Sequence, residues 1–357
     1  MLVYWLMFAF FAFGALIAQP ALAADRTDRQ PDPVHQRFRP FFIAGAIATV
    51  CLIGLRYEVG GDWASYLAIF NMTRGETLAA SLRVGDPAYQ LLNWVVATLG
   101  ARVWLVNLVS AAIFGWGLYR LCSVQPSPWL AFAVAVPYMV IVVAMGYTRQ
   151  SIALGVLMAG LAKQSRGGST INFALYVAVA ASFHKTAAVM YPLVALSGKG
   201  SRFVNFLIVV FASFLLYDLF LGDAMSGLVR NYIDTEYSSQ GALTRCAMNF
   251  LAAILLWMFK GKLGFERHEF LIWRNFGLAA LLFMILLVLL PSSTVVDRLS
   301  LYIIPLQIVV FARVALLGQN RLAGTVAVLA YSFAVQFVWL NFADHARYWV
   351  PYRFFPF

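Results

Sequence analysis

Cationic side chains interrupt two strongly apolar stretches of the sequence. In the first stretch, residues 147–163, Arg149 precedes the apolar run, and in the second, residues 182–192, His184 and Lys185 lie between two apolar runs. A charged group in bare lipid costs on the order of a few kcal/mol or more, so it must face water, an opposite charge or a ligand. Arginine binds phosphate oxygens in pairs and keeps its charge at physiological pH. These positions predict contacts to a multiply charged anion, although Lys185 has the alternative of reaching toward lipid headgroups.

Carboxylates and tyrosines occur on segments that the hydropathy pattern assigns to the same side of the membrane. Asp62 is placed to begin a short helix with Trp63, Leu67 and Phe70 on an apolar side and Tyr66 on the other. For a single tyrosine, the aromatic belt at the membrane interface is an alternative to contact with a sugar. For a single carboxylate, an ion pair with a neighbouring arginine is an alternative to catalysis.

These residue types suit glycosyl transfer from a lipid-linked phosphate or diphosphate. Cations stabilise the charge that develops on a departing diphosphate, and a carboxylate accepts the proton of the attacking sugar hydroxyl. The scheme requires no metal ion and no other cofactor, because arginines can neutralise the diphosphate, and a divalent ion held by aspartates is the alternative. The sequence contains no GxxxxGK[ST], HExxH or GxSxG motif, which disfavours ATP chemistry, metalloprotease and serine hydrolase functions.

The composition places these residues in a helical membrane protein. Of the 357 residues, 62% are hydrophobic and 11% are charged, which is more apolar surface than a soluble domain can bury. Long continuous apolar runs indicate helices rather than barrel strands. The net charge of +11 fits membrane orientation and an anionic ligand, and no nucleic-acid-binding pattern accompanies it. Cys51, Cys122 and Cys246 show no metal-ligand spacing and are expected in the core.

The N-terminal segment decides the predicted topology. It ends in a small-residue pattern typical of a cleaved signal peptide, but no Lys or Arg precedes its apolar run, so we interpret Met1–Ala18 as a retained span. About 12 transmembrane helices then follow. The predicted apolar segments are 2–18, 40–55, 87–99 joined to 102–120, 129–146, 150–162, 170–183, 186–198, 203–221, 246–259, 270–290, 299–316 and 322–340.

Loop charges orient this arrangement. Loops on the side of Arg26 carry more Lys and Arg than the opposite loops, which predicts a cytoplasmic Arg26 loop and both termini outside. Residues 1–357 then form a single transmembrane domain. Residues 56–100, with short interfacial helices, and residues 222–246 form two periplasmic loops.

Some of the predicted spans are short. The apolar run after Arg149 has about 13 residues and the runs flanking His184 have about 14, which corresponds to roughly 20 Å of helix. The hydrocarbon core is about 30 Å thick. The outer ends of these helices are therefore predicted to lie below the membrane surface, in a protein-lined cavity.

Seven short motifs occur in an order that resembles the EpsG/Wzy-type polysaccharide polymerases of bacterial envelopes, which make O-antigen and exopolysaccharide. The resemblance extends from about Gly54 to Tyr352, and the motifs are GGDWASY, DPAYQLLNW, TRQSIA, SFHKTAAVMYP, GALTR, DRLSLY and WVPY. It implies that undecaprenyl-diphosphate-linked repeat units are joined at the periplasmic face of the inner membrane. It also implies a GT-C-like fold, in which Asp62 has the place of a catalytic Asp in the first outer loop.

The resemblance and the residues together predict a set of roles. Asp62 is the general base, with Asp86, Asp234 and Asp297 as competing carboxylates. The predicted substrate-binding residues are Arg149, His184, Lys185, Arg245, Arg298, Tyr66, Asp86, Tyr89, Tyr302 and Tyr352. The cations bind diphosphate and the tyrosines shape sugar subsites. The expected partners are a lipid-linked glycan donor and acceptor, membrane lipid and a chain-length regulator protein. An O-antigen ligase, another lipid-sugar-dependent GT-C enzyme and a lipid-linked oligosaccharide flippase are the alternatives.

Overall fold

The computed structural model describes residues 1–19, 33–197, 241–290 and 293–356, together with positions 207, 210 and 214. Regular structure in these ranges is helical, and the extended pairing found there is an isolated antiparallel bridge between Arg56 and Phe354. Apart from positions 207, 210 and 214, the predicted span 203–221 lies outside the described residues. Residues 222–240 of the predicted loop 222–246, with Asp234, lie outside them as well. The prediction of an all-helical chain is confirmed for the part that the structure describes.

The chain divides into two compact units. The first comprises Met1–Gly75, Asn93–Ser151 and Phe311–Phe357, and the second comprises Glu76–Leu92 and Ile152–Val310. Three of the boundaries between the units fall within α5 (Pro87–Thr98), α8 (Thr148–Ser165) and α16 (Pro305–Val314), and the fourth falls between Gly75 and Glu76. The predicted single transmembrane domain stays a prediction.

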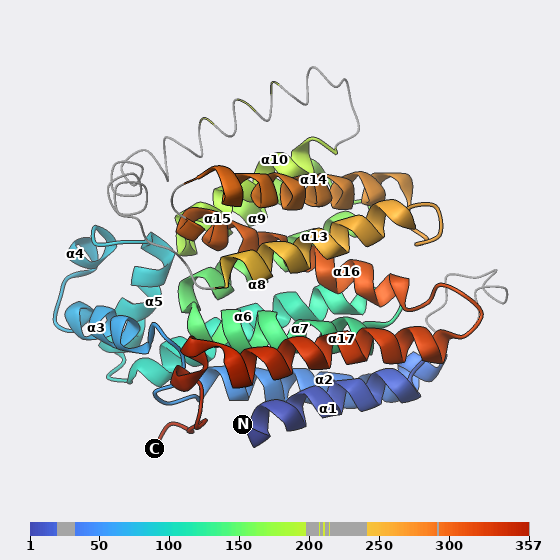
Figure 1. Cartoon of the computed structure of the whole chain (residues 1–357). Coiled ribbons are helices and arrows are strands. Elements are labelled where there is room, and N and C mark those ends of the chain that lie inside the picture. Colours follow the sequence, from blue (N-terminus) through green and yellow to red (C-terminus); the bar gives the residue numbers. More distant parts are fainter. Residues whose placement is uncertain are drawn as a thin grey trace. The chain divides into compact units, whose positions relative to one another are not determined.

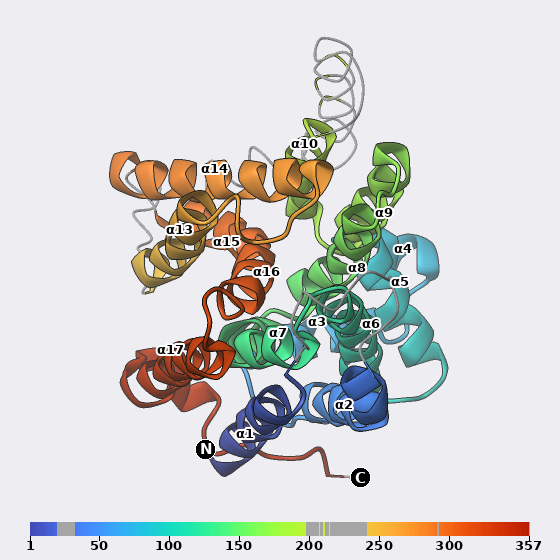
Figure 2. The same ribbon diagram turned by 90° about the vertical axis from the view of Figure 1, so that its right-hand side faces the viewer.

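The long helices of the first unit pack side by side (Figures 1 and 2). They are α1 (Leu2–Ile17), α2 (Pro33–Gly54), α6 (Val103–Ser123), α7 (Pro128–Ala135) with the π-helix η2 (Val136–Ala144), and α17 (Arg321–Phe342). Aromatic side chains fill the space between α1, α2 and α7, and the rings of Phe11 and Phe132 stack at 3.9 Å. Such aromatic pairs contribute about 0.5–1.5 kcal/mol beyond their burial.

Shorter elements join the long helices of the first unit. They are α3 (Trp63–Thr73), which follows the loop after α2, and the 3₁₀ turn η6 (Asp344–Tyr348), which follows α17. The bridge between Arg56 and Phe354 pairs the loop after α2 with the segment after η6. The segments that follow α2 and α17 are thereby paired within this unit.

The second unit combines the long helices α13 (Ala242–Met258) and α14 (Arg267–Leu289) with short helical elements (Figures 1 and 2). The short elements are α4 (Leu78–Leu82), α9 (Thr170–Phe183), the 3₁₀ helix η3 (Lys185–Val189), α10 (Met190–Ala195), α15 (Ser293–Ser300) and the 3₁₀ turn η5 (Leu301–Ile303). Helices α13 and α14 pack along each other, and both contact α15.

Four helices of the described part are long and apolar enough to cross a membrane. They are Arg37–Gly54, Val103–Ser123, Arg267–Leu289 and Arg321–Phe342. The pair Ser293–Ile303 and Pro305–Val314, bent by 48°, makes a fifth if it counts as one span. The protein is therefore a helical membrane protein, whereas the count of 12 spans and the GT-C-like fold stay predictions.

Most helix boundaries lie within a few residues of the predicted segments, with larger differences at the starts of α2 and α15, and α8 is longer than predicted. The predicted span 170–183 coincides with α9, and the predicted kink at Pro305 coincides with the bend before α16. The prediction of a helix of about 13 residues after Arg149 is wrong, because α8 begins at Thr148 and has 18 residues. The helix adds Thr148 and Arg149 before the predicted segment 150–162 and residues 163–165 after it, and the protein buries Thr148 and Gln164.

Candidate functional site

Asp86 joins two segments of the second unit at the point where α9 ends. His184 adopts an extended conformation after α9, and η3 begins at Lys185. The Asp86 carboxylate accepts a hydrogen bond from the Lys185 backbone N–H (3.2 Å), and its second oxygen lies 3.7 Å from Nδ1 of His184. Asp86 is buried, with 6% of its surface exposed. One carboxylate thus caps the first turn of η3 and forms an ion pair with His184 when the imidazole is protonated.

Two of the predicted sugar-binding tyrosines lie in the interior of the second unit. Tyr302, in η5, is fully buried, and its hydroxyl lies 3.2 Å from the Thr186 hydroxyl, one residue after Lys185. Tyr89, one turn into α5, retains 1% of its surface. The structure therefore brings Asp86, His184 and Lys185 together. Tyr302 contacts Thr186, the residue that follows Lys185. The assignment of Tyr89 and Tyr302 to sugar subsites stays a prediction.

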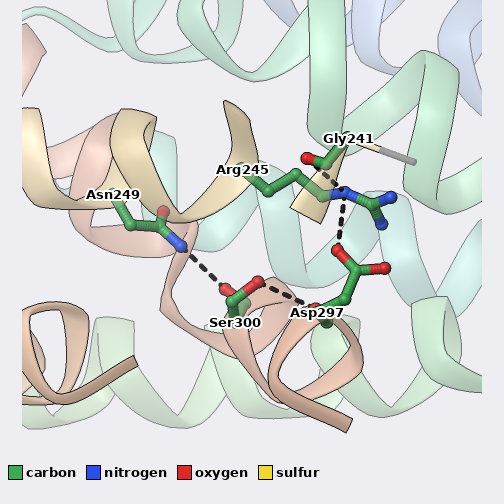
Figure 3. A network of polar contacts seen from close by, with 5 residues as sticks. All are labelled: Gly241, Arg245, Asn249, Asp297 and Ser300. Atoms are coloured by element: carbon green, nitrogen blue, oxygen red, sulfur yellow. Dashed lines mark hydrogen bonds and ion pairs between the residues drawn. The ribbon is translucent and has the colours of Figure 1, made fainter. Parts of the chain in front are cut away.

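A buried ion pair links α13 to α15 in the same unit. Figure 3 shows the Arg245 side chain reaching from α13 toward Asp297, where Nε and the carboxylate oxygen are 2.8 Å apart. The side chains are 7% and 3% exposed. Nε also lies 3.4 Å from the Gly241 carbonyl oxygen. Sequence analysis treated Arg245 as a diphosphate ligand and Asp297 as a candidate base, and the structure pairs them with each other. Arg298, the next residue, is half-buried.

Polar contacts continue from this pair along the start of the bent helix. The Ser300 hydroxyl donates to the Asp297 carbonyl (2.8 Å), and the Ser300 carbonyl accepts from the Asn249 amide (2.8 Å; Figure 3). The Gln307 amide in turn donates to the Asn249 oxygen (2.7 Å). Sequence analysis missed Asn249 and Gln307. The available signal was that Asn249 follows Arg245 by four residues, which places both on one face of α13.

Arg149 and Tyr66 meet in the first unit. The Arg149 guanidinium carbon lies 6.0 Å from the centroid of the Tyr66 ring, a distance typical of a cation–π contact. Asp62 is the N-cap residue of α3, as predicted, and is half-buried. The predicted faces of α3 are wrong, because Tyr66 is buried with Phe70 while Leu67 is 37% exposed. A one-turn spacing of Tyr66 and Phe70 defines the buried side of this helix.

Arg56 is a buried cation that sequence analysis did not single out. Only 1% of its surface is exposed. Its guanidinium donates to the backbone carbonyls of Ile53 and Val59 and to the Thr148 hydroxyl (2.9 Å) at the start of α8. Arg56 therefore fixes the loop after α2 to the residue directly before Arg149. The only sequence signal was an arginine at the end of an apolar run.

Tyr352 lies in the C-terminal segment of the first unit. Its hydroxyl donates to the Leu52 carbonyl at 2.7 Å. Burial raises the pKa of Tyr352 well above the ordinary value, and the nearby Arg56 charge opposes the shift. The phenol therefore stays protonated and keeps its hydrogen bond. Its predicted sugar contact stays a prediction.

The contacts within each unit join segments that the predicted topology assigns to the same side. In the first unit, residues 55–60 contact residues 348–355, and both were predicted outside. In the second unit, Asp86 contacts residues 184–185, also predicted outside. At the predicted cytoplasmic side, the Arg313 guanidinium donates to the Gln125 side chain (3.4 Å) in the first unit. The orientation of the chain in a membrane remains a proposal.

Metal ligands do not gather in the described residues. No group of three or more His, Cys, Asp or Glu side chains that could hold a metal ion occurs in the parts of the chain that the structure describes.

The fold and these buried ionic groups define a helical membrane protein with cations in its interior. Comparison with protein families matches residues 40–354 to the EpsG family. No match is found among curated proteins or among solved structures. The chain belongs to the EpsG family, and the resemblance inferred from the sequence motifs is confirmed. Membership of this family suggests a polysaccharide polymerase.

Proposed function

We propose that the protein is a membrane glycosyltransferase that polymerises undecaprenyl-diphosphate-linked oligosaccharide repeat units at the periplasmic face of the bacterial inner membrane. The observation that carries this proposal is the match to the EpsG family over residues 40–354. A helical membrane protein suits a lipid-linked substrate, because the polyprenyl chain stays in the bilayer while the sugar is transferred. A GT-C-like arrangement of about 12 spans is part of the proposal.

In the second unit, we assign the binding of phosphate oxygens to His184, Lys185 and Arg298. The ion pair with Asp86 supports this role, because a carboxylate 3.7 Å from Nδ1 favours a charged imidazole. Arg245 acts with this group by holding Asp297, and with it the neighbouring Arg298, through the 2.8 Å ion pair. Fixed cations lower the barrier because they stabilise negative charge as the diphosphate departs.

In the first unit, we assign Asp62 the role of general base and Arg149 that of an anion ligand. As the acceptor hydroxyl oxygen bonds to the anomeric carbon, the bond from that carbon to the diphosphate oxygen breaks. The hydroxyl proton passes to the Asp62 carboxylate. Asp86 and Asp297 are the competing carboxylates in the described part of the chain.

A reconstituted reaction tests the function directly. The purified protein is placed in liposomes with undecaprenyl-diphosphate-linked repeat units, and the products are separated by size. A ladder of chain lengths is expected. Transfer of a single chain to lipid A would identify a ligase instead, and movement of the lipid across the bilayer without new glycosidic bonds would identify a flippase.

Variants test the assigned roles in the same assay. Asp62→Asn is expected to bind donor and lose turnover, and normal turnover would place the base elsewhere. Arg149→Ala and Arg298→Ala are expected to stop chain growth, while the exposed Arg166→Ala serves as the matched control. Arg149→Lys is expected to recover little activity, since lysine lacks the planar fork that binds two oxygens. Full activity of Arg149→Lys would instead indicate a simple point charge.

A further inference from the structure

The C-terminal segment of the first unit is attached to the loop that leads into Asp62. Three backbone hydrogen bonds join them: Tyr57 N–H to Arg353 O (2.9 Å), Phe355 N–H to Leu55 O (2.8 Å) and Gly60 N–H to Tyr348 O (2.9 Å). The Arg353 side chain adds an exposed ion pair with Glu58 at 2.7 Å. Residues almost 300 positions apart in sequence therefore form one local structure.

Trp349 is the anchor of this segment. Its side chain is buried, with 3% of its surface exposed. The indole N–H donates to the Ile141 carbonyl in η2 (2.7 Å), and the Trp349 carbonyl accepts from the Tyr4 hydroxyl in α1 (2.7 Å). The ring also meets the Trp339 ring of α17 edge-on at 5.0 Å. Three helical elements thus determine where Trp349 lies.

The indole ring in turn packs against the residues directly before Asp62. A Cβ atom at Gly61 would lie 3.9 Å from the ring, in ordinary contact, and a Cβ at Gly146 would lie 2.8 Å from it. Gly60 has φ +108° and its Cβ position would collide with the Met145 carbonyl, so only glycine fits there. The Gly60–Gly61 segment is therefore enclosed between Trp349 and the end of η2.

From these contacts we propose that Trp349 is a positioning residue, and that the C-terminal segment sets the place of Asp62 at the start of α3. The proposal rests on the assignment of Asp62 as the general base. A base must lie within hydrogen-bond reach of the proton it removes, and a displacement of about 1 Å can cost roughly 100-fold in rate. The Gly60–Gly61 segment has no side chains of its own, and the contacts from residues 348–355 and 145–146 hold it in place before Asp62.

Two measurements distinguish a role of Trp349 in positioning Asp62 from a role in the stability of the protein alone. The first is the reconstituted polymerisation assay with Trp349→Ala and Trp349→Phe. Trp349→Ala is expected to lower kcat by about 100-fold with little change in the KM for donor. Trp349→Phe is expected to recover only part of the activity, because the phenyl ring lacks the outer indole atoms that face Gly61 and the N–H that donates to Ile141. Trp116→Ala, which removes a tryptophan that is 46% exposed on α6, is the matched control.

The second measurement does not depend on activity. A single cysteine is introduced as Asp62→Cys after Cys51, Cys122 and Cys246 are replaced by alanine, and its rate of labelling by a soluble maleimide is followed. Adding Trp349→Ala is expected to increase that rate several-fold, since the loop is no longer held. Equal labelling rates, or equal kcat in Trp349→Ala and the parent, would overturn the proposal.

A second variant decides the matter if Trp349→Ala does not accumulate in the membrane. Phe355→Pro removes the N–H that donates to Leu55, while Phe354→Pro changes a residue whose N–H is not used in the bridge. Loss of kcat and faster labelling in Phe355→Pro alone support the proposal, and identical behaviour of the two variants refutes it. If Asp62→Asn turns over normally while labelling still depends on Trp349, the assignment of the base fails and the attachment of the loop stands.

Discussion

At the scale of single residues, the Arg245–Asp297 pair buries two opposite charges in the second unit. Both charges have been removed from water, and the cost of that transfer reaches several kcal/mol per ion in proteins, so the pair must be well compensated. The 2.8 Å contact and the Gly241 carbonyl supply part of that compensation. Removing one partner alone leaves the other charge buried.

Asp297→Ala is therefore expected to destabilise the protein by about 3–5 kcal/mol. The double variant Arg245→Met with Asp297→Leu is expected to recover most of that loss, because it buries two apolar side chains of similar size. The measurement is the fraction of protein that stays monodisperse in detergent after heating. Glu266→Ala, at a side chain that is 75% exposed, is the control. Equal losses in the single and double variants would contradict a dominant role for the buried charge.

At the scale of elements, the junction of α9 and η3 shows how a short helix ends inside a membrane protein. Helix α9 has 14 residues, a rise of about 21 Å, and the hydrocarbon core is about 30 Å thick. Backbone groups at such an end need partners within the protein, because lipid offers none. The Asp86 carboxylate, from the residue that precedes α5, supplies one of them to the Lys185 N–H.

Asp86→Asn and Asp86→Ala separate the hydrogen bond from the charge. The asparagine retains an oxygen acceptor for Lys185, so we expect stability close to the parent but weaker polymerisation, since His184 loses its anionic neighbour. The alanine loses both, and we expect destabilisation of about 1–3 kcal/mol. Thermal unfolding in detergent and the polymerisation assay measure the two effects, with the exposed Glu76→Ala as the control. Equal stability of the parent, Asp86→Asn and Asp86→Ala would show that the hydrogen bond from Lys185 to Asp86 is dispensable.

At the scale of the whole molecule, the arrangement within each unit supports one membrane topology. The end of α2, the end of η2 and the segment after α17 meet in the first unit, and the alternation of spans predicted from the sequence puts all three outside. The positive-inside rule assigns the opposite loops to the cytoplasm. The contacts indicate which segments share one side of the membrane, and the positive-inside rule predicts which side faces the cytoplasm.

Single cysteines in the protein without its native cysteines test this topology. A cysteine replacing Glu58 or His345 is expected to react with a membrane-impermeant maleimide in cells whose outer membrane has been opened. A cysteine replacing Lys163 or Gly261 is expected to react only after the inner membrane is also disrupted. All four positions are exposed in the structure, so accessibility within the protein is matched. The reverse pattern would place the proposed site on the cytoplasmic side.

The sequence by itself determined the class of the protein, its helices and its family. Long apolar runs leave a backbone in lipid no alternative to helix, which is why α9 was predicted at the right residues. The kink was predicted at the right place because Pro305 interrupts the hydrogen bonds of a helix. The family was inferred from short motifs in the sequence, and the match over residues 40–354 confirms it.

Only the tertiary structure decided the partners of the polar residues. Arg245 and Asp297 each looked available for substrate, and they bind each other because α13 and α15 are packed together. The start of α8 and the buried side of α3 were likewise set by neighbours far away in sequence. Hydropathy predicts whether a segment lies in lipid or in water. A hydrogen bond between distant residues depends on which segments pack together, and no local sequence pattern specifies that packing.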